Sequence, residues 1–74
     1  MGDNMSYAVK VHTMAGTFAL GPYGSEDDAN RVISEIANGG TGPYRTQRGS
    51  LVRFITQPEC LELIRFRKKD QNGF

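Results

Sequence analysis

The sequence has few of the residues that disulfide-bonded and zinc-binding domains require. Its 74 residues include one cysteine, Cys60, and one histidine, His12. A single cysteine cannot close an intramolecular disulfide, and a structural zinc site takes about four Cys or His ligands. We therefore expect a protein without a disulfide scaffold, a bound metal or another cofactor, in a reducing, cytoplasmic location.

Long apolar runs and a strong net charge are missing as well. No run approaches the ~20 apolar residues that span a membrane, and residues 1–6 carry an acid where a signal peptide carries basic residues. Nine Lys and Arg against eight Asp and Glu leave a net charge of +1. This balance excludes a histone-like protein and an acidic-tail protein, and we expect no contact with a membrane.

The size of the chain limits its organisation to one small domain. A chain of 8.2 kDa has no room for a dinucleotide-binding unit. Polar residues dominate both ends, which favours flexible segments there. We expect a flexible N-terminus over residues 1–6, a single domain over residues 7–67 and a flexible tail over residues 68–74.

Period-two alternation predicts two strands near the N-terminus. Over residues 7–14, Val9 and Val11 alternate with more polar side chains, as in a half-buried strand. Gly16 can take the positive φ of a tight hairpin turn, and the apolar pattern resumes over residues 17–20. The sequence therefore predicts an antiparallel hairpin.

A helix is predicted over residues 25–38. Pro22 and its neighbouring glycines break the second strand. Ser25 is a preferred N-cap, and the three acids that follow it suit the positive end of the helix dipole. One apolar stripe follows at helical spacing, formed by Ala29, Val32, Ile33, Ile36 and Ala37.

Two further strands are expected at residues 51–56 and 60–67, and residues 44–47 form either a short strand or a loop. Together these elements predict an α+β fold of the order ββαββ. It would be a two-layer domain in which an antiparallel sheet of four, or possibly five, strands carries one amphipathic helix on one face. The last two strands are apolar on both sides, so the pattern does not decide which face meets the helix.

Groups that could carry catalysis are not brought together by the sequence. Cys60 and His12 could serve as nucleophile and base, but no local signature supports this pair. The glycine-rich residues 39–42 follow the helix, where carbonyl oxygens repel phosphate. The three acids after Ser25 point in different directions on a helix and do not converge on one ion. We expect the protein not to be an enzyme.

Charge is distributed unevenly along the chain. Residues 1–43 hold two basic and five acidic side chains, whereas residues 44–74 hold seven basic and three acidic ones. Arginine suits bidentate contacts with phosphate and carboxylate groups. We expect Arg53, Arg65 and Arg67 to share one sheet face, and Arg45 and Arg48 to lie near one edge of the sheet. The candidate contacts with nucleic acid or a partner protein are Arg45, Arg48, Arg53, Arg65, Arg67, Lys68 and Lys69.

The surplus of apolar surface favours a binding function over a catalytic one. A single helix cannot cover both faces of the predicted sheet, so a second copy or a partner protein is expected to cover the rest. The layout is shared by many short proteins of bacteria and their phages. We expect a small binding or regulatory protein that acts through protein–protein contacts of its sheet as a homodimer. The alternative is a nucleic-acid-binding protein that uses the basic C-terminal half.

Overall fold

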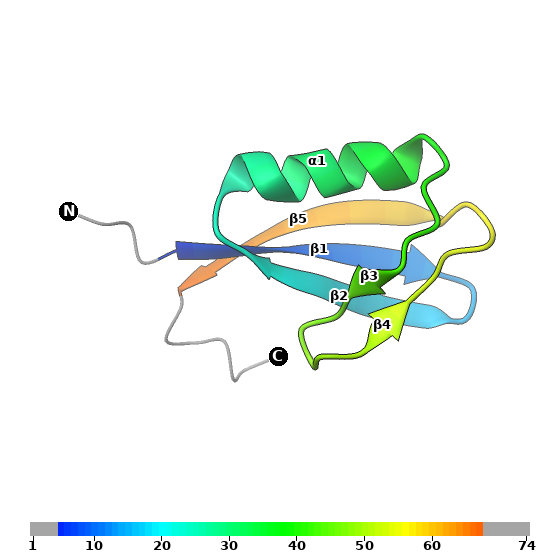
Figure 1. Ribbon diagram of the computed structural model, residues 1–74, viewed down its shortest axis with the longest axis horizontal. Coiled ribbons are helices and arrows are strands. Elements are labelled where there is room, and N and C mark those ends of the chain that lie inside the picture. Colours follow the sequence, from blue (N-terminus) through cyan, green and yellow to red (C-terminus); the bar gives the residue numbers. More distant parts are fainter. Residues whose placement is uncertain (1–4, 68–74) are drawn as a thin grey trace.

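The computed structural model describes residues 5–67, which form an α+β fold with one helix and antiparallel strands (Figure 1). Residues 1–4 and 68–74, which hold most of the two predicted flexible segments, lie outside the described residues. The first strand begins at Met5, two residues before the expected start. In chain order the elements are β1 (Met5–Thr13), β2 (Gly16–Tyr23), α1 (Glu26–Ala37), β3 (Tyr44–Arg45), β4 (Leu51–Val52) and β5 (Cys60–Arg67).

The main sheet has three antiparallel strands in the order β2-β1-β5. Its register places Val9 of β1 opposite Leu20 of β2 on one side and Leu63 of β5 on the other. Because side chains alternate along each strand, these three residues lie on the same face. This register brings the apolar positions of all three strands together beneath the helix.

The expected single sheet of four or five strands is not confirmed. β3 and β4 form a separate two-stranded sheet, joined to β2 by one bridge between Leu20 and Thr46. The predicted strand at 51–56 ends at Val52, and the backbone N–H of Phe54 donates to Thr41 in a loop. Phe54 is buried while Leu51 and Ile55 are exposed, so of the apolar residues that suggested a strand, Phe54 fills the core from an irregular segment.

The second strand continues through the residues expected to break it. β2 runs to Tyr23, and the pairing with β1 shifts by one residue between Tyr7 and Val9. Gly21 has a φ of 130° at this irregularity, a conformation that L side chains rarely adopt. Glycine and proline therefore produce a bulge here, and the strand ends only at Tyr23.

The predicted helix is confirmed. The Ser25 hydroxyl accepts a hydrogen bond from the backbone N–H of Asp28 at 3.2 Å, which caps the N-terminus. Ala29 and Ile36 are buried, and Val32 and Ile33 of the apolar stripe pack around them, whereas Ala37 is exposed. Among residues 5–67, no helix has the length and the apolar character needed to cross a membrane.

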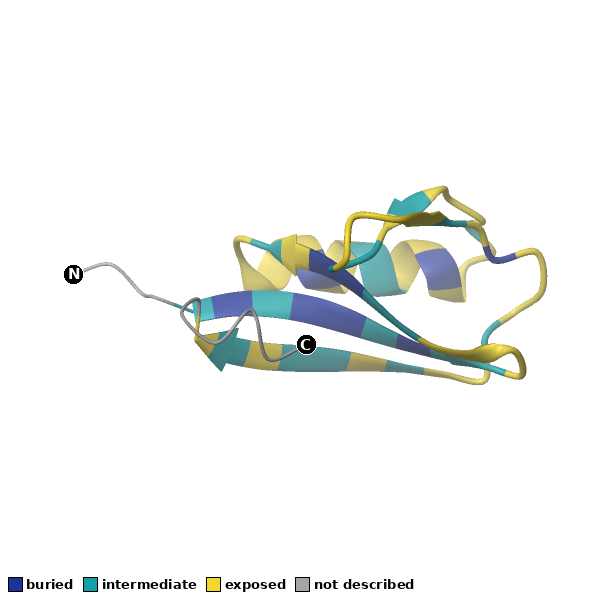
Figure 2. Cartoon of the chain, turned by 90° about the horizontal axis from the view of Figure 1, so that it is seen from below, coloured by how far each residue is buried: buried dark blue, intermediate teal, exposed yellow. Residues whose placement is uncertain are grey.

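The core lies between α1 and the face of the sheet that carries Val9 and Val11. The buried residues of the sheet lie on β1 and β2, whereas the residues of β5 are partly or fully exposed (Figure 2). Phe54 closes the core beside the rings of Phe18 and Tyr44, each 6.0 Å away between ring centroids. The structure thus settles which sheet face meets the helix.

Ile36 and Ile55 offer a matched pair of substitutions to test this core. Ile36 is fully buried, whereas Ile55 is 90% exposed. We expect Ile36→Ala to lower the free energy of unfolding by about 2–5 kcal/mol, because it leaves a cavity under the helix. Ile55→Ala should change it by less than about 0.5 kcal/mol. Urea denaturation followed by circular dichroism measures both.

If Ile36→Ala does not fold, Ile36→Val is the milder variant, with an expected loss of about 0.5–1.5 kcal/mol. Equal losses for the same substitution at positions 36 and 55 would contradict this placement of the core.

Candidate functional site

The candidate arginines fall into two groups at opposite sides of the sheet. Arg65 and Arg67 lie on β5, at one edge. Arg45, Arg48 and Arg53 surround the small β3–β4 sheet, which adjoins β2 at the other edge. The expectation that Arg53 shares a sheet face with the arginines of β5 is therefore wrong, because residue 53 follows the short β4 outside the main sheet. Lys68 and Lys69 lie outside the described residues.

The β5 arginines lie on the helix-facing side of the sheet, and Arg65 contacts the start of α1. The guanidinium of Arg65 is 3.5 Å from Glu26 Oε1 and 5.9 Å from the centre of the Tyr7 ring. Both side chains of the ion pair are about half exposed, so water screens their attraction. This pair places the C-terminal end of β5 beside the N-terminus of α1.

The hairpin arginines are exposed and have no acidic neighbour in sequence. No Asp or Glu occurs over residues 36–58, which contain all three. The hairpin is held by a hydrogen bond from the Thr46 N–H to the Ser50 carbonyl and another from the Ser50 N–H to Thr46 Oγ1. It therefore presents a positively charged loop beside β2.

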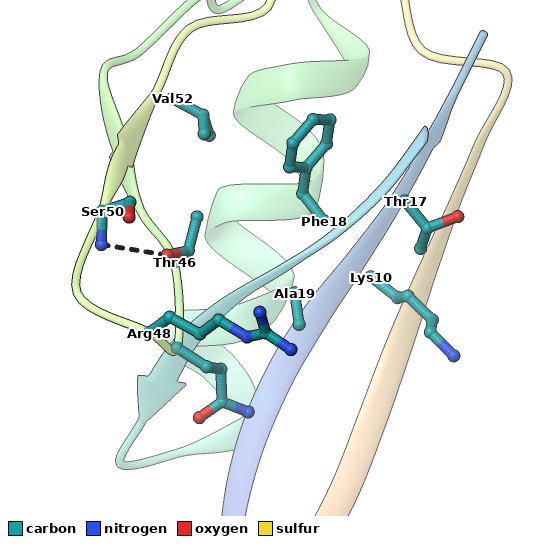
Figure 3. A pocket seen from close by; sticks show the side chains of 9 residues that line it. Lys10, Thr17, Phe18, Ala19, Thr46, Arg48, Ser50 and Val52 are labelled. Carbon is teal, nitrogen blue, oxygen red and sulfur yellow. Dashed lines mark hydrogen bonds between the residues drawn. The ribbon is translucent and has the colours of Figure 1, made fainter. Parts of the chain in front are cut away.

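A shallow pocket of about 460 Å³ lies between β2 and this hairpin (Figure 3). Phe18 and Val52 give it an apolar side, and Arg48 reaches over Ala19. The ammonium group of Lys10 points away from that guanidinium (Figure 3). The two cations of the pocket therefore do not converge on one anionic ligand.

β3 is anchored to the helix through Tyr44. Its hydroxyl donates a hydrogen bond to Glu35 Oε1 at 3.3 Å, and its ring stacks on Phe54. Burial raises the pKa of Tyr44, and the negative charge of Glu35 and this hydrogen bond raise the pKa further. The phenol thus remains neutral and keeps donating at physiological pH.

The sheet face away from the helix carries a row of polar contacts across all three strands. His12 Nε2 lies 3.0 Å from Glu62 Oε1 on β5, and His12 Nδ1 lies 3.4 Å from Thr17 Oγ1 on β2. The hydrogen bond from His12 lowers the pKa of Glu62, and the positive charges of His12 and Lys10 add to this effect, while desolvation opposes it. The row links β2, β1 and β5 side by side.

Glu62 is the member of this row that sequence reasoning missed. The His12 ring contacts Glu62 and Thr17 in the described structure, although Cys60 is its direct partner in the strand register. Period-two alternation in both strands was the available signal, but the register between them is a tertiary property. Within residues 5–67, no group of three or more His, Cys, Asp or Glu side chains could hold a metal ion.

The two edges of the main sheet differ in how well they are protected. At β2, the N–H of Gln47 donates to the Ala19 carbonyl, and Pro22 has no N–H to offer. At β5, no strand other than β1 pairs with Cys60–Arg67 among the described residues. Figure 2 shows β5 along the margin of the molecule with no described helix or strand beyond it. Among the described residues, β5 is thus the edge with a strand partner on one side only.

Comparison with known proteins adds no assignment to these surfaces. The chain was compared with protein-family models, with curated proteins and with solved structures, and no match was found in any of the three. A proposal about function therefore rests on the charges, contacts and edges of this chain alone.

The row of contacts around His12 predicts a specific pKa change. In the native protein the pKa of Glu62 lies below its ordinary value, and we expect His12→Ala, which removes the donor, to raise it towards that value. Thr17→Val, which removes only the other His12 contact, should leave the pKa of Glu62 lowered. Titration of the side-chain carboxyl carbons by NMR measures both variants.

The same contact gives a stability that depends on pH. Folding lowers the pKa of Glu62. The stabilisation of the folded protein by this contact is therefore fully present above the pKa that Glu62 has in the unfolded chain. It is lost as the pH falls through the pKa that Glu62 has in the folded protein. A Glu62 pKa that stays the same in His12→Ala would contradict the contact between His12 and Glu62.

Proposed function

We propose that this chain is a small non-enzymatic binding protein that acts through protein–protein contacts of its three-stranded sheet, as a homodimer. The observation that carries the proposal is the one-sided cover of this sheet. α1 packs against one face, and β5 is an eight-residue strand with neighbours on one side only among the described residues.

An edge strand of this length is a natural place for association. Its backbone N–H and C=O groups on the open side can pair with a strand of another chain. Proteins that remain monomeric shorten such an edge, bend it or cover it. The β2 edge has such protection in its bulge, its proline and the β3–β4 hairpin, and this difference favours β5 as the side that binds.

The small size of the domain also favours association. A chain of 74 residues buries only about 60% of the surface that its unfolded form exposes. Three strands and one helix of about three turns provide a core of few buried side chains. Extending the sheet across a partner would bury further apolar surface and add hydrogen bonds on β5.

The homodimer is tested by sedimentation equilibrium over ~1–500 µM protein. We expect a mass near twice 8.2 kDa through most of this range, with dissociation only at the lowest concentrations. A monomeric mass at 500 µM would overturn the proposal, because a surface that associates so weakly could not work as a dimer in a cell.

A second candidate function, binding of single-stranded nucleic acid, is favoured by the arginines of the β3–β4 hairpin. Arg45, Arg48 and Arg53 are exposed in a stretch without acids. Guanidinium groups bind phosphate oxygens and stack on bases. This function would use the hairpin beside β2 and leave the β5 edge free.

The nucleic-acid candidate predicts binding that depends strongly on salt. Each phosphate contact releases counterions, so three contacts to a single strand would give a slope near −2 for the logarithm of the affinity against that of the salt concentration. Arg45→Gln/Arg48→Gln/Arg53→Gln should abolish binding to a fluorescent oligonucleotide, whereas the control Arg65→Gln/Arg67→Gln should keep most of it.

Fluorescence anisotropy at several salt concentrations measures this affinity. No binding at 50 mM salt, or an equal loss in both sets of variants, would exclude the hairpin as a nucleic-acid site.

A further inference from the structure

We infer that the β5 edge pairs antiparallel with the β5 edge of a second copy, with Leu63 opposite the partner's Leu63. This inference rests on the proposed homodimer and specifies which surface and which register form it. The result would be a continuous six-stranded sheet with both helices on the same face.

The charges along β5 favour antiparallel pairing with an identical strand. Glu59 immediately precedes β5 and Glu62 lies in its first half, whereas Arg65 and Arg67 lie in its second half. A two-fold axis perpendicular to the sheet would place the acidic half of one strand beside the basic half of the other. Glu59 of each copy would then meet an arginine of the other on the helix-facing side, while Glu62 points to the opposite face. A parallel arrangement would bring like charges together.

The ends of α1 add to this complementarity. Gln57 Nε2 donates to the Ile36 carbonyl, which ties the C-terminus of α1 to the segment before β5. The last turn of α1 contains no basic residue, so no lysine or arginine of its own offsets the negative end of its dipole. An antiparallel partner would bring its Arg65 and Arg67 towards that end of the helix.

The alternation of side chains limits the possible registers. Directly opposite residues in an antiparallel pair point to the same face, and the two helices must share a face to form one sheet with one helix layer. The two-fold axis must therefore pass beside a single residue of β5, which then lies opposite its own copy. Only an axis near the middle of β5 pairs most of its residues with the second copy. The four candidate positions for the axis are Glu62, Leu63, Ile64 and Arg65.

Like charges exclude two of these four registers. An axis beside Glu62 would set Glu62 opposite the partner's Glu62, and an axis beside Arg65 would set two arginines opposite each other, which is destabilising. Leu63 and Ile64 remain. They differ in what lies opposite Leu61, which is the partner's Arg65 for an axis at Leu63 and the partner's Arg67 for an axis at Ile64.

The axis at Leu63 gives an acid an arginine partner, because it uses Glu59, the residue immediately before β5. In this register Glu59 lies directly opposite the partner's Arg67, and the partner's Arg65 lies two positions further along the opposite strand, at the diagonal position. The axis also sets Leu63, which packs against the core, beside its own copy, so the two cores become continuous beneath the helices. With the axis at Ile64, every directly opposite partner of an arginine is a leucine.

Two cysteine pairs distinguish these registers. Both carry Cys60→Ser and Leu61→Cys, and they differ only in the second cysteine, at Arg65 or at Arg67. Within one chain these positions are about 13 Å and 20 Å apart along the strand, too far for a disulfide. Directly opposite residues of paired strands have Cα atoms about 4.5–5.5 Å apart, within the range that a disulfide spans.

Under mild oxidation we expect Leu61→Cys/Arg65→Cys to form a covalent dimer at least tenfold faster than Leu61→Cys/Arg67→Cys, as measured by non-reducing gel electrophoresis. Faster crosslinking of the Arg67→Cys pair would overturn the Leu63 register. Slow crosslinking of both pairs, in variants that sediment as dimers, would overturn the β5 interface while the homodimer stands. If the unmodified chain sediments as a monomer, the homodimer itself fails, and the proposed function fails with it.

Discussion

The packing of α1 on one face of β1 is the contact on which the other features depend. Val9 and Val11 are fully buried beneath the helix, where Ala29 and Ile36 meet them. Because this contact uses the only helix of the described chain, the opposite sheet face has to tolerate water, and it does so with the row formed by His12 and its neighbours. The polar row covers only part of that face, since Ala8, Ile64 and Phe66 lie on the same face towards its other end.

The elements governed by local pattern were predictable from the sequence. The helix follows from the spacing of its apolar stripe and from the Ser25 cap, and both are interactions within a few residues. The hairpin of β1 and β2 follows from alternation around Gly16. The bulge at Gly21 was not predictable, because glycine and proline end a strand in one context and bend it in another.

The predictions from sequence were wrong where the position of a residue depends on tertiary contacts. Phe54 looked like part of a strand, yet it enters the core from a loop because Phe18 and Tyr44 leave a place for its ring. The arginines of the C-terminal half looked like one surface, but the strand order places Arg53 and Arg65 on opposite sides of β1. The contact between His12 and Glu62 was missed for the same reason, because the sequence of one strand does not determine its register with another.

The proposed role of β5 as the edge that binds a second copy is tested most directly by amide hydrogen exchange at two protein concentrations. We expect the amides of β5 to exchange more slowly at ~500 µM than at ~1 µM, because pairing with a partner strand protects them. The amides of β2 should exchange alike at both. Exchange of β5 that does not depend on concentration, or protection confined to β2, would contradict this role.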